Sequence, residues 1–506
     1  MSESVRVLEV LSKGEERFEQ WRRRAGMVIA PLAFLVVLAL PPDALKPEAH
    51  RLAAVMAAVM VLWISEALPM PVTALLGAAA CVVLRVAPAR EVFASFADPL
   101  IFLFIGSFIL AQAIFYHRLD RRVAFGVLSI SWIGARPARI LLAFGAVTAF
   151  ISAWISNTAT TAMMFPIGLS IINFLFSSEE KGGRPVNRGY ATALMLITAF
   201  GASIGGFATP VGTPTNVVGI GFIRRLLGVD LSFFKWAMIG APVAVCLFAF
   251  LYLYLNRLCP AGVAEIEGSR EMIAREKRSL GSWTRGQKSV LVAFGVTVLL
   301  WVVPGIIALA LGEESVVYQN INRSMPEAVP AMIGAGLLFL LPGDRGGGRA
   351  ITWGEAVKID WGVVLLFGGG LTFGVLSFQT GLAEWAGRGL TGALSLHGTL
   401  GMLGASVVVA AVMSETTSNV ASANMVIPVV VSMAQAAGVD PLEPTLGAAL
   451  GASLGFMLPV STPCNAIVYG SGHVPLMRMV RYGLLLDVVG IIVIIVLVHL
   501  LVPFVR

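Results

Sequence analysis

The sequence predicts an all-α, multi-pass membrane protein whose two halves are related by an internal repeat. Of its 506 residues, 57% are hydrophobic and only 13% are charged, whereas soluble domains carry roughly 25% charged residues. Apolar stretches of about 20 residues, long enough to cross a bilayer as helices, recur along the whole chain. Two of the apolar runs are interrupted at matching places, by Ser156-Asn157-Thr158 and by Ser418-Asn419-Val420.

We expect eleven membrane spans and two re-entrant helical hairpins. The spans are expected near 27–41, 51–67, 70–86, 99–116, 190–222, 233–255, 289–311, 328–342, 361–379, 445–472 and 483–504. The runs 138–176 and 399–436 carry the polar triplets and are expected to be the hairpins, which enter and leave the membrane on one side. Between the halves, 256–288 alternates Glu with Lys and Arg, which is typical of a solvated linker.

The distribution of positive charge predicts the topology. The net charge of +7 arises from Lys and Arg in loops between spans, so no basic face for nucleic acid is expected. With the hairpins counted as re-entrant, 26 of the 36 Lys and Arg residues fall on one side, in 1–26, 117–139, 177–189, 256–288, 343–360 and 473–482. Because positively charged loops stay inside, we expect a cell (inner) membrane protein with a cytoplasmic N-terminus and an external C-terminus.

The internal repeat extends beyond the triplets. Ser156 and Ser418 are 262 positions apart, as are Pro166 and Pro428. Further matches at offsets of 262, 250 and 249 are Asp98–Gly106 with Asp360–Gly368, Gly201–Gly205 with Gly451–Gly455, and Val211–Asn216 with Val460–Asn465. By the predicted topology the first hairpin enters from the cytoplasm and the second from outside, and inverted repeats of this kind are the architecture of alternating-access transporters.

Each half contains a second break in its apolar helices. Pro214 and Pro463 lack an N–H donor and disfavour helix at the preceding threonines, Thr213 and Thr462. A broken helix at membrane depth has free carbonyls at one end and free N–H groups at the other. Carbonyl, Asn and Ser oxygens suit a hard cation such as Na⁺, and helix N-termini with Ser, Asn and Thr donors suit a carboxylate.

Basic residues are missing around these breaks. No Lys, Arg or His occurs from Ser414 to Gly470, or between Arg139 and Lys181. A multivalent anion bound here would have no side-chain counter-charge, and an uncompensated charge is costly in a low-dielectric site. Bound cations would supply the missing charge, so the sequence favours cation-coupled transport of an anion.

The residues resemble those of the divalent anion/sodium symporter family, which includes the dicarboxylate and citrate carriers. The similarity runs from about Trp63 to about Gly483. Besides the triplets and Thr-Pro segments, its marks are Trp63–Pro69, Ser95–Pro99, Gly368–Leu371, Thr380–Ala383 and Tyr469–Gly472. The resemblance implies a homodimer in which a scaffold holds two transport domains that move like elevators.

The resemblance and the repeat together divide the chain. The expected parts are an arm (1–26), a first transmembrane helix and loop (27–50), a first inverted repeat (51–255), a cytoplasmic linker (256–288) and a second inverted repeat (289–506). Within the repeats, scaffold helices are expected in 51–97 and 289–342, transport-domain elements in 98–232 and 361–475, and a return and a last helix in 233–255 and 483–504.

The resemblance also implies the binding residues. One Na⁺ would be held by Ser152, Ser156, Asn157 and Gly212, and a second by Ser414, Thr417, Asn419 and Ser461. Substrate carboxylates would meet Asn157, Thr158 and Thr213 from one half and Ser418, Asn419, Thr462 and Pro463 from the other. The second triplet ends in Val420 where many members have threonine, so this position is expected to shape the pocket without a hydrogen bond.

The leading functional hypothesis is Na⁺-coupled symport of C4-dicarboxylates or related di- and tricarboxylates, with two or more Na⁺ ions and no organic cofactor. A dicarboxylate exchanger of the same fold is the alternative. A membrane-embedded enzyme is a remote third possibility, because the five histidines are dispersed and form no metal-binding or acid–base pattern.

Overall fold

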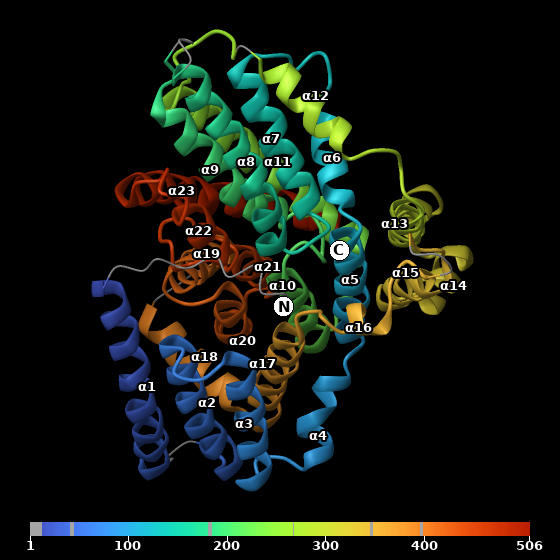
Figure 1. Ribbon diagram of the computed structural model, residues 1–506. Helices are drawn as coiled ribbons and strands as arrows, with labels where there is room; N and C mark the ends of the chain where they lie inside the picture. Colours follow the sequence, from blue (N-terminus) through green and yellow to red (C-terminus); the bar gives the residue numbers. More distant parts are fainter. Residues whose placement is uncertain are drawn as a thin grey trace.

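The computed structural model describes residues 13–40, 45–180, 185–266, 268–344, 348–394 and 398–505. This part of the chain is helical, with one isolated β-bridge between Pro342 and Arg349. The first described element is α1 (Lys13–Ala39), so the described end of the predicted arm and the first predicted span form one helix (Figure 1). Residues 1–12 of that arm lie outside the described residues.

The two halves contain corresponding series of helices. The first has α2 (Pro47–Ser65), α3 (Met70–Val83), α4 (Ala89–Ala94), α5 (Pro99–Tyr116), α6 (Leu119–Leu128), α7 (Pro137–Ser152), α8 (Asn157–Glu180), α9 (Arg188–Gly205), α10 (Pro214–Phe222) and α11 (Phe233–Leu258). The linker carries α12 (Ser269–Ser279). The second has α13 (Arg285–Leu311), α14 (Val316–Ser324), α15 (Ala328–Leu340), α16 (Trp353–Ala356), α17 (Trp361–Thr380), α18 (Leu382–Leu394), α19 (Gly398–Thr416), α20 (Asn419–Ala436), α21 (Leu442–Gly451), α22 (Pro463–Tyr469) and α23 (Leu476–Leu501). Short 3₁₀ or π segments are Ser95–Ala97, Ile223–Leu227 and Val502–Phe504.

Nine helical segments in the described part of the chain are long and apolar enough to cross a membrane. They include α8, α19 and α20, which are arms of the predicted hairpins. The predicted spans 190–222 and 445–472 are each split into two shorter helices, α9–α10 and α21–α22. Helices α3 and α15, with 14 and 13 residues, reach only about 20 Å at 1.5 Å per residue, which is less than a hydrocarbon core of about 30 Å. Five predicted spans are therefore missing from the nine: the two short helices, the two broken ones and 27–41, which lies in the long helix α1.

The two halves are intertwined. Helix α5 of the first half packs on α15 of the second, and α17 of the second packs on α3 of the first. The hairpins exchange partners in the same way, because α8 packs on α22 and α20 packs on α10. Glycines permit the closest contacts: a Cβ atom at Gly106 would lie 2.6 Å from the carbonyl carbon of Ala331, and one at Gly369 would lie 2.5 Å from Ala74 Cβ. Neither half therefore buries its helices without the other.

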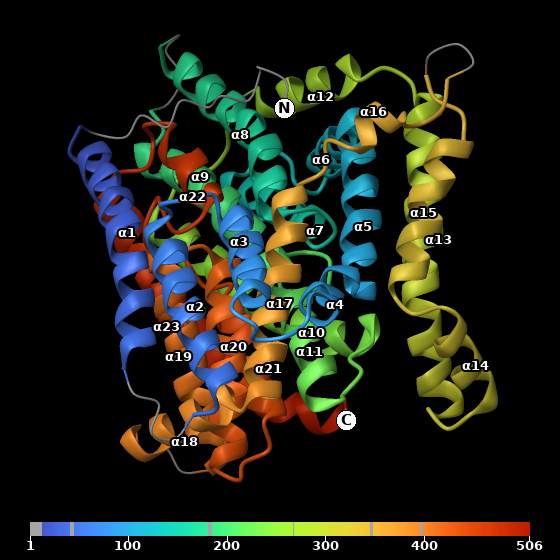
Figure 2. The same cartoon turned by 90° about the horizontal axis from the view of Figure 1, so that it is seen from below.

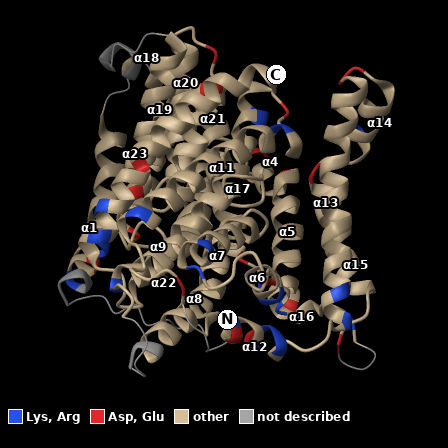
Figure 3. Ribbon diagram, turned by 90° about the horizontal axis from the view of Figure 1, so that it is seen from above, with Lys and Arg blue, Asp and Glu red and all other residues tan. Residues whose placement is uncertain are grey.

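The connecting segments sort to two ends of the molecule. Figure 2 shows α6, α12, α16 and the C-terminal end of α8 at one end, with α14, α18 and the C-terminus at the other. The first group contains segments that the charge distribution assigned to a common side. In Figure 3 most Lys and Arg lie toward the ends of the helices, and the middle of the molecule has few charged residues. This arrangement is that of a multi-pass membrane protein.

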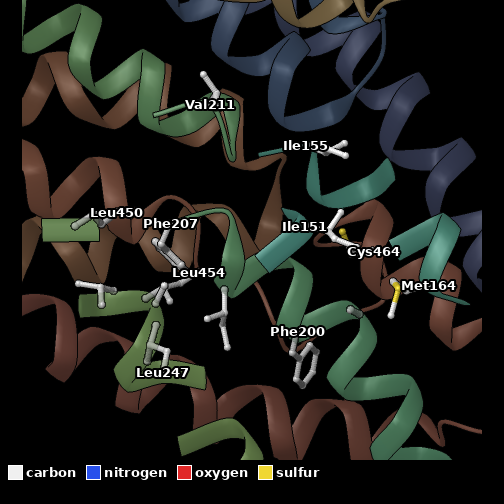
Figure 4. Close-up of a cluster of buried hydrophobic side chains, with 14 of the residues drawn as sticks. Ile151, Ile155, Met164, Phe200, Phe207, Val211, Leu247, Leu450, Leu454 and Cys464 are labelled. Carbon is white, nitrogen blue, oxygen red and sulfur yellow. The ribbon is translucent and has the colours of Figure 1, made fainter. Parts of the chain in front are cut away.

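A hydrophobic core surrounds the breaks (Figure 4). Phe200 of α9 packs edge-on against Phe456 of the second half, with ring centroids 5.2 Å apart. Phe207 and Leu454 come from the two breaks, and each is fully buried. The irregular backbone is therefore enclosed by protein, which is the condition under which it is tolerated at membrane depth.

Candidate functional site

The two hairpin tips have the same local structure. Helix α7 ends at Ser152 and α8 begins at Asn157; α19 ends at Thr416 and α20 begins at Asn419. Ser156 accepts a hydrogen bond from the Ala159 N–H at 3.3 Å, and Ser418 accepts one from the Ala421 N–H at 3.2 Å. Each serine thus caps the N-terminus of the returning helix.

A serine and an asparagine meet across each tip. Ser152 Oγ lies 2.9 Å from Asn157 Oδ1, and Ser414 Oγ lies 2.8 Å from Asn419 Oδ1. Both serines are fully buried. The structure therefore brings together two residues of each predicted cation site, in the same geometry in both halves.

Backbone oxygens surround the first predicted cation site. Asn157 Oδ1 also lies 3.3 Å from the Gly212 carbonyl and 3.1 Å from that of Ala202. Neither carbonyl nor an amide oxygen can donate, so these groups suit either the N–H groups of a rotated Asn157 amide or a cation. The Ser152 hydroxyl and the Gly212 and Ala202 carbonyls are oxygen groups of the kind that a hard cation such as Na⁺ prefers. Ser156 Oγ uses one lone pair to cap α8 and keeps the other.

The residues of the second predicted cation site have a wider range of partners. Ser414 Oγ faces two acceptors, Asn419 Oδ1 and the Ala452 carbonyl at 2.7 Å, with a single hydrogen to share between them. Ser461 Oγ contacts the backbone oxygen of Glu415 at 3.3 Å and its carboxylate. Thr417 Oγ1 lies 3.5 Å from the Trp63 carbonyl, at the limit for a hydrogen bond, and within the described chain it has no hydrogen bond to Ser414, Asn419 or Ser461.

The Thr-Pro breaks also match. Thr213 and Thr462 share an extended backbone, with φ of −141° and ψ of 145° and 148°. Two residues after each proline, a buried asparagine donates to two carbonyls of the preceding loop. Asn216 Nδ2 donates to Gly206 and Thr209 at 2.8 Å each, and Asn465 Nδ2 donates to Gly455 and Leu458 at 3.1 and 2.9 Å. These amides satisfy carbonyls that a broken helix leaves without partners.

The two halves touch through their breaks. Thr215 Oγ1, in the first break, hydrogen-bonds Ser453 Oγ of the second half. At the equivalent place, the Cys464 thiol adjoins Thr158, Thr161 and Ser203 of the first half. The first hairpin tip therefore lies beside the second Thr-Pro break.

A cavity of about 990 Å³ opens at the second break. Its lining includes Ser418, Thr462 and Pro463, which were predicted to bind substrate, together with Ser461. Asn157, Thr158, Thr213 and Asn419 are absent from the lining. Arg22 and Arg23 of α1 line the same cavity, and Arg22 lies 2.8 Å from Glu19 and 3.2 Å from Glu66.

Sequence reasoning missed three features of this region. The arginines of α1 were assigned to the N-terminal arm without a role, and only the fold brings them to the cavity. Asn216 and Asn465 were recognised within the repeat without a role. Asp487, the third feature, lies in α23 beside Glu415. The sequence did contain a signal for it, because a carboxylate inside the predicted span 483–504 indicates a functional residue.

Comparison with known proteins gives consistent matches. The family model described as "Sodium:sulfate symporter transmembrane region" matches residues 21–504. The sodium-dependent dicarboxylate transporter SdcS of Staphylococcus saprophyticus is 32% identical over 499 residues, covering 97% of this chain and 94% of that protein. SdcS of Staphylococcus aureus is 31% identical over 490 residues, covering 95% and 91%.

Two solved transporters share the fold. The YdaH transporter of Alcanivorax borkumensis superposes with a TM-score of 0.52 at 13% identity, covering 96% of this chain and 98% of that one. MtrF of Neisseria gonorrhoeae superposes with a TM-score of 0.54 at 14% identity, covering 84% and 85%.

Proposed function

Because this chain belongs to the sodium:sulfate symporter family, we propose that it is a Na⁺-coupled transporter importing succinate-, malate- or fumarate-like di- and tricarboxylates. The relatives named above are sodium-dependent dicarboxylate transporters. The observation that carries the proposal is the matched Ser-Asn pair at each hairpin tip, with acceptor oxygens converging on it in both halves.

The coupling ions are assigned to the two tips. In the first, Na⁺ would be held by Ser152, Ser156, Asn157 and Gly212, with the Ala202 carbonyl as a further neighbour. In the second it would be held by Ser414, Thr417, Asn419 and Ser461, after Thr417 turns away from Trp63. Each bound ion would supply positive charge where the apolar runs contain none, and the protein would orient its oxygens through the caps and breaks.

The substrate is assigned to the space between the tips and breaks. We propose Asn157, Thr158 and Thr213 on one side and Ser418, Asn419, Thr462 and Pro463 on the other. The cavity beside Ser418 and Thr462 supports the second set. Contact between Cys464 and Thr158 supports a shared site, because it brings the first tip close to the second break.

We further propose elevator-type alternating access in a homodimer, with a cytoplasmic N-terminus. The transport domain would comprise 98–232 and 361–475, and the scaffold 51–97 and 289–342, with α5 and α17 at the boundary because they pack on α15 and α3. The second tip contacts the scaffold through Ser418 Oγ and Met70 Sδ at 3.2 Å. Elevator movement would break this contact.

The test is succinate uptake into proteoliposomes containing the purified protein. The proposal expects accumulation when Na⁺ is outside at higher concentration, and little uptake when choline replaces Na⁺. Equal uptake with and without a Na⁺ gradient would contradict it. Uptake that ignores Na⁺ but needs internal dicarboxylate would identify an exchanger instead.

A further inference from the structure

Glu415 lies at the end of α19 with its carboxylate directed into the second break. One carboxylate oxygen accepts a hydrogen bond from the Met457 N–H at 2.8 Å, and the other from the Ser461 hydroxyl. The side chain is 7% exposed. Both carboxylate oxygens are therefore directed at the loop that runs from Met457 to Ser461.

Asp487 approaches the same loop from α23. Gly483 and Gly490, one turn before and about one turn after it, face the loop: Cβ atoms there would lie 2.2 Å from Phe456 O and 2.7 Å from Leu454 Cδ2. Asp487 lies between them on this helix face, and its carboxyl group adjoins Glu415 and the Phe456 backbone. The residue is 6% exposed, and among the described residues neither of its oxygens has a hydrogen-bond donor.

The first half lacks this pair. The glycine equivalent to Gly483 is Gly240, whose Cβ atom would lie 2.2 Å from Phe207 O. Counting from these landmarks, Ala244 stands where the second half has Asp487, and Ala153 stands where it has Glu415. The fold therefore forms the break without carboxylates, and the pair is an addition to the second half.

Two adjacent buried carboxylates need either a shared proton or a compensating cation. Within the described chain, neither Glu415 nor Asp487 has a Lys, Arg or His partner within 4.0 Å. Uncompensated charges of like sign in a low-dielectric site repel strongly. We propose that Asp487 and Glu415 bind an additional Na⁺ ion, distinct from the two at the hairpin tips.

This site would be coupled to the second tip, because Ser461 belongs to the proposed tip site and also donates to Glu415. The inference rests on the proposed function, since Na⁺ is the ion expected in transport. Binding of the additional ion would fix the loop that carries Ser461 and Thr462, and would thereby favour substrate binding at the second break.

The first measurement is Na⁺ binding by the purified full-length protein, followed as the rise in thermal unfolding midpoint when Na⁺ replaces choline. We expect Asp487→Asn, which keeps the shape and removes the charge, to raise the half-saturating Na⁺ concentration about tenfold. Glu443→Gln is the matched control, because Glu443 is another buried carboxylate of this half and instead pairs with His499 at 2.9 Å. The double variant Glu415→Ala/Asp487→Ala reproduces the residues of the first half and tests folding without the pair.

The second measurement is the ratio of ²²Na⁺ to ¹⁴C-succinate taken up by proteoliposomes. We expect Asp487→Asn to lower this ratio by about one ion, with Glu443→Gln unchanged. An unchanged ratio and unchanged Na⁺ dependence in a folded Asp487→Asn protein would overturn the inference, as would stabilisation of the wild type by Mg²⁺ but not Na⁺. If the wild type shows no Na⁺-coupled uptake, the proposed function is contradicted instead. The Na⁺-binding measurement does not depend on uptake, so it tests the additional site separately.

Discussion

Asn216 and Asn465 hold the two helix breaks through the same pair of hydrogen bonds in opposite halves of the molecule. Each side-chain amide donates to the carbonyls ten and seven positions earlier, at distances between 2.8 and 3.1 Å. Both asparagines are fully buried. The loop that bears Gly212 or Ser461 is therefore tied to the helix that follows it.

Replacing either asparagine by alanine is expected to destabilise the protein and abolish uptake. Each substitution leaves two buried carbonyls without a donor, at about 1–3 kcal/mol for each group. The thermal unfolding midpoint of the purified protein measures the loss. Asn424→Ala is the control, because Asn424 donates to a single carbonyl, that of Val420 in its own helix. Equal losses in all three variants would contradict this role.

Removal of the tip serines is expected to weaken Na⁺ coupling in both halves. Ser152→Ala and Ser414→Ala each delete one buried oxygen of the proposed site, and an interaction with a charged group contributes about 1.5–3 kcal/mol. The Na⁺ concentration that half-activates succinate uptake should rise about tenfold or more. Ser406→Ala is the matched control in α19, because that hydroxyl donates only to the Met402 carbonyl. A normal Na⁺ activation curve for Ser414→Ala would exclude the serine as a ligand.

The sequence predicted the repeat and the breaks because their signals are local. The Thr-Pro pairs mark the breaks because Pro214 and Pro463 each begin a new helix after an extended threonine, and the triplets mark the tips directly. Contacts between residues far apart in the sequence could not be predicted. Nothing near Asp487 indicates that its helix packs on the loop beyond Glu415, and nothing near Arg22 indicates that α1 lines a cavity beside Thr462. Such contacts depend on how the halves exchange helices, which local periodicity does not specify.

The arginines of α1 are expected to assist anion entry. Arg22 and Arg23 line the cavity that reaches Ser418 and Thr462, and positive charge at a cavity wall raises the local concentration of an anion. Arg23→Gln should raise the KM for succinate several-fold at low ionic strength, and less in added choline chloride, because salt screens exposed charges. The Na⁺ half-activation constant should not change. Arg17→Gln on the same helix is the control, and an equal effect there would argue against a local role.

Asp120 is expected to make stability depend on pH. It lies in α6 and is 4% exposed, and burial raises its pKa to about 6 despite the N–H of Arg121. The folded protein therefore holds this proton more tightly than the unfolded chain, and stability should fall as the pH rises from about 4 through 6. At pH 8, Asp120→Asn should raise the unfolding midpoint and increase the free energy of unfolding by about 1–3 kcal/mol. At pH 4.5 it should change both quantities little.

Asp344 is a control because its pKa is shifted in the opposite direction. Burial tends to raise its pKa, but hydrogen bonds from the Gly286 N–H, the Thr284 hydroxyl and His117 outweigh it, so the pKa is lowered. Its contribution is present above the normal Asp pKa and is lost as the pH falls through the lowered value. Asp344→Asn should therefore lower the midpoint at pH 8. A gain at pH 8 for both variants would show that removal of any carboxylate suffices.

Val420 and Thr158 occupy equivalent positions in the two tips, and exchanging their side chains tests how far the substrate site is symmetric. Val420 is half-buried, whereas Thr158 is exposed and adjoins Cys464. Threonine and valine have similar shapes but only threonine carries a hydroxyl. Thr158→Val removes a possible substrate donor, so it should raise the KM for succinate by up to about tenfold, the effect of one lost hydrogen bond of about 1.4 kcal/mol.

Val420→Thr adds a donor at the equivalent place. It should leave the Na⁺ half-activation constant unchanged and alter the ratio of succinate to citrate uptake, because a new hydroxyl favours anions that present an oxygen to it. Competition of each unlabelled anion against labelled succinate measures the ratio. If both variants match the wild type for every anion, the residue after the tip asparagine does not contact substrate, and selectivity must come from the Thr-Pro breaks.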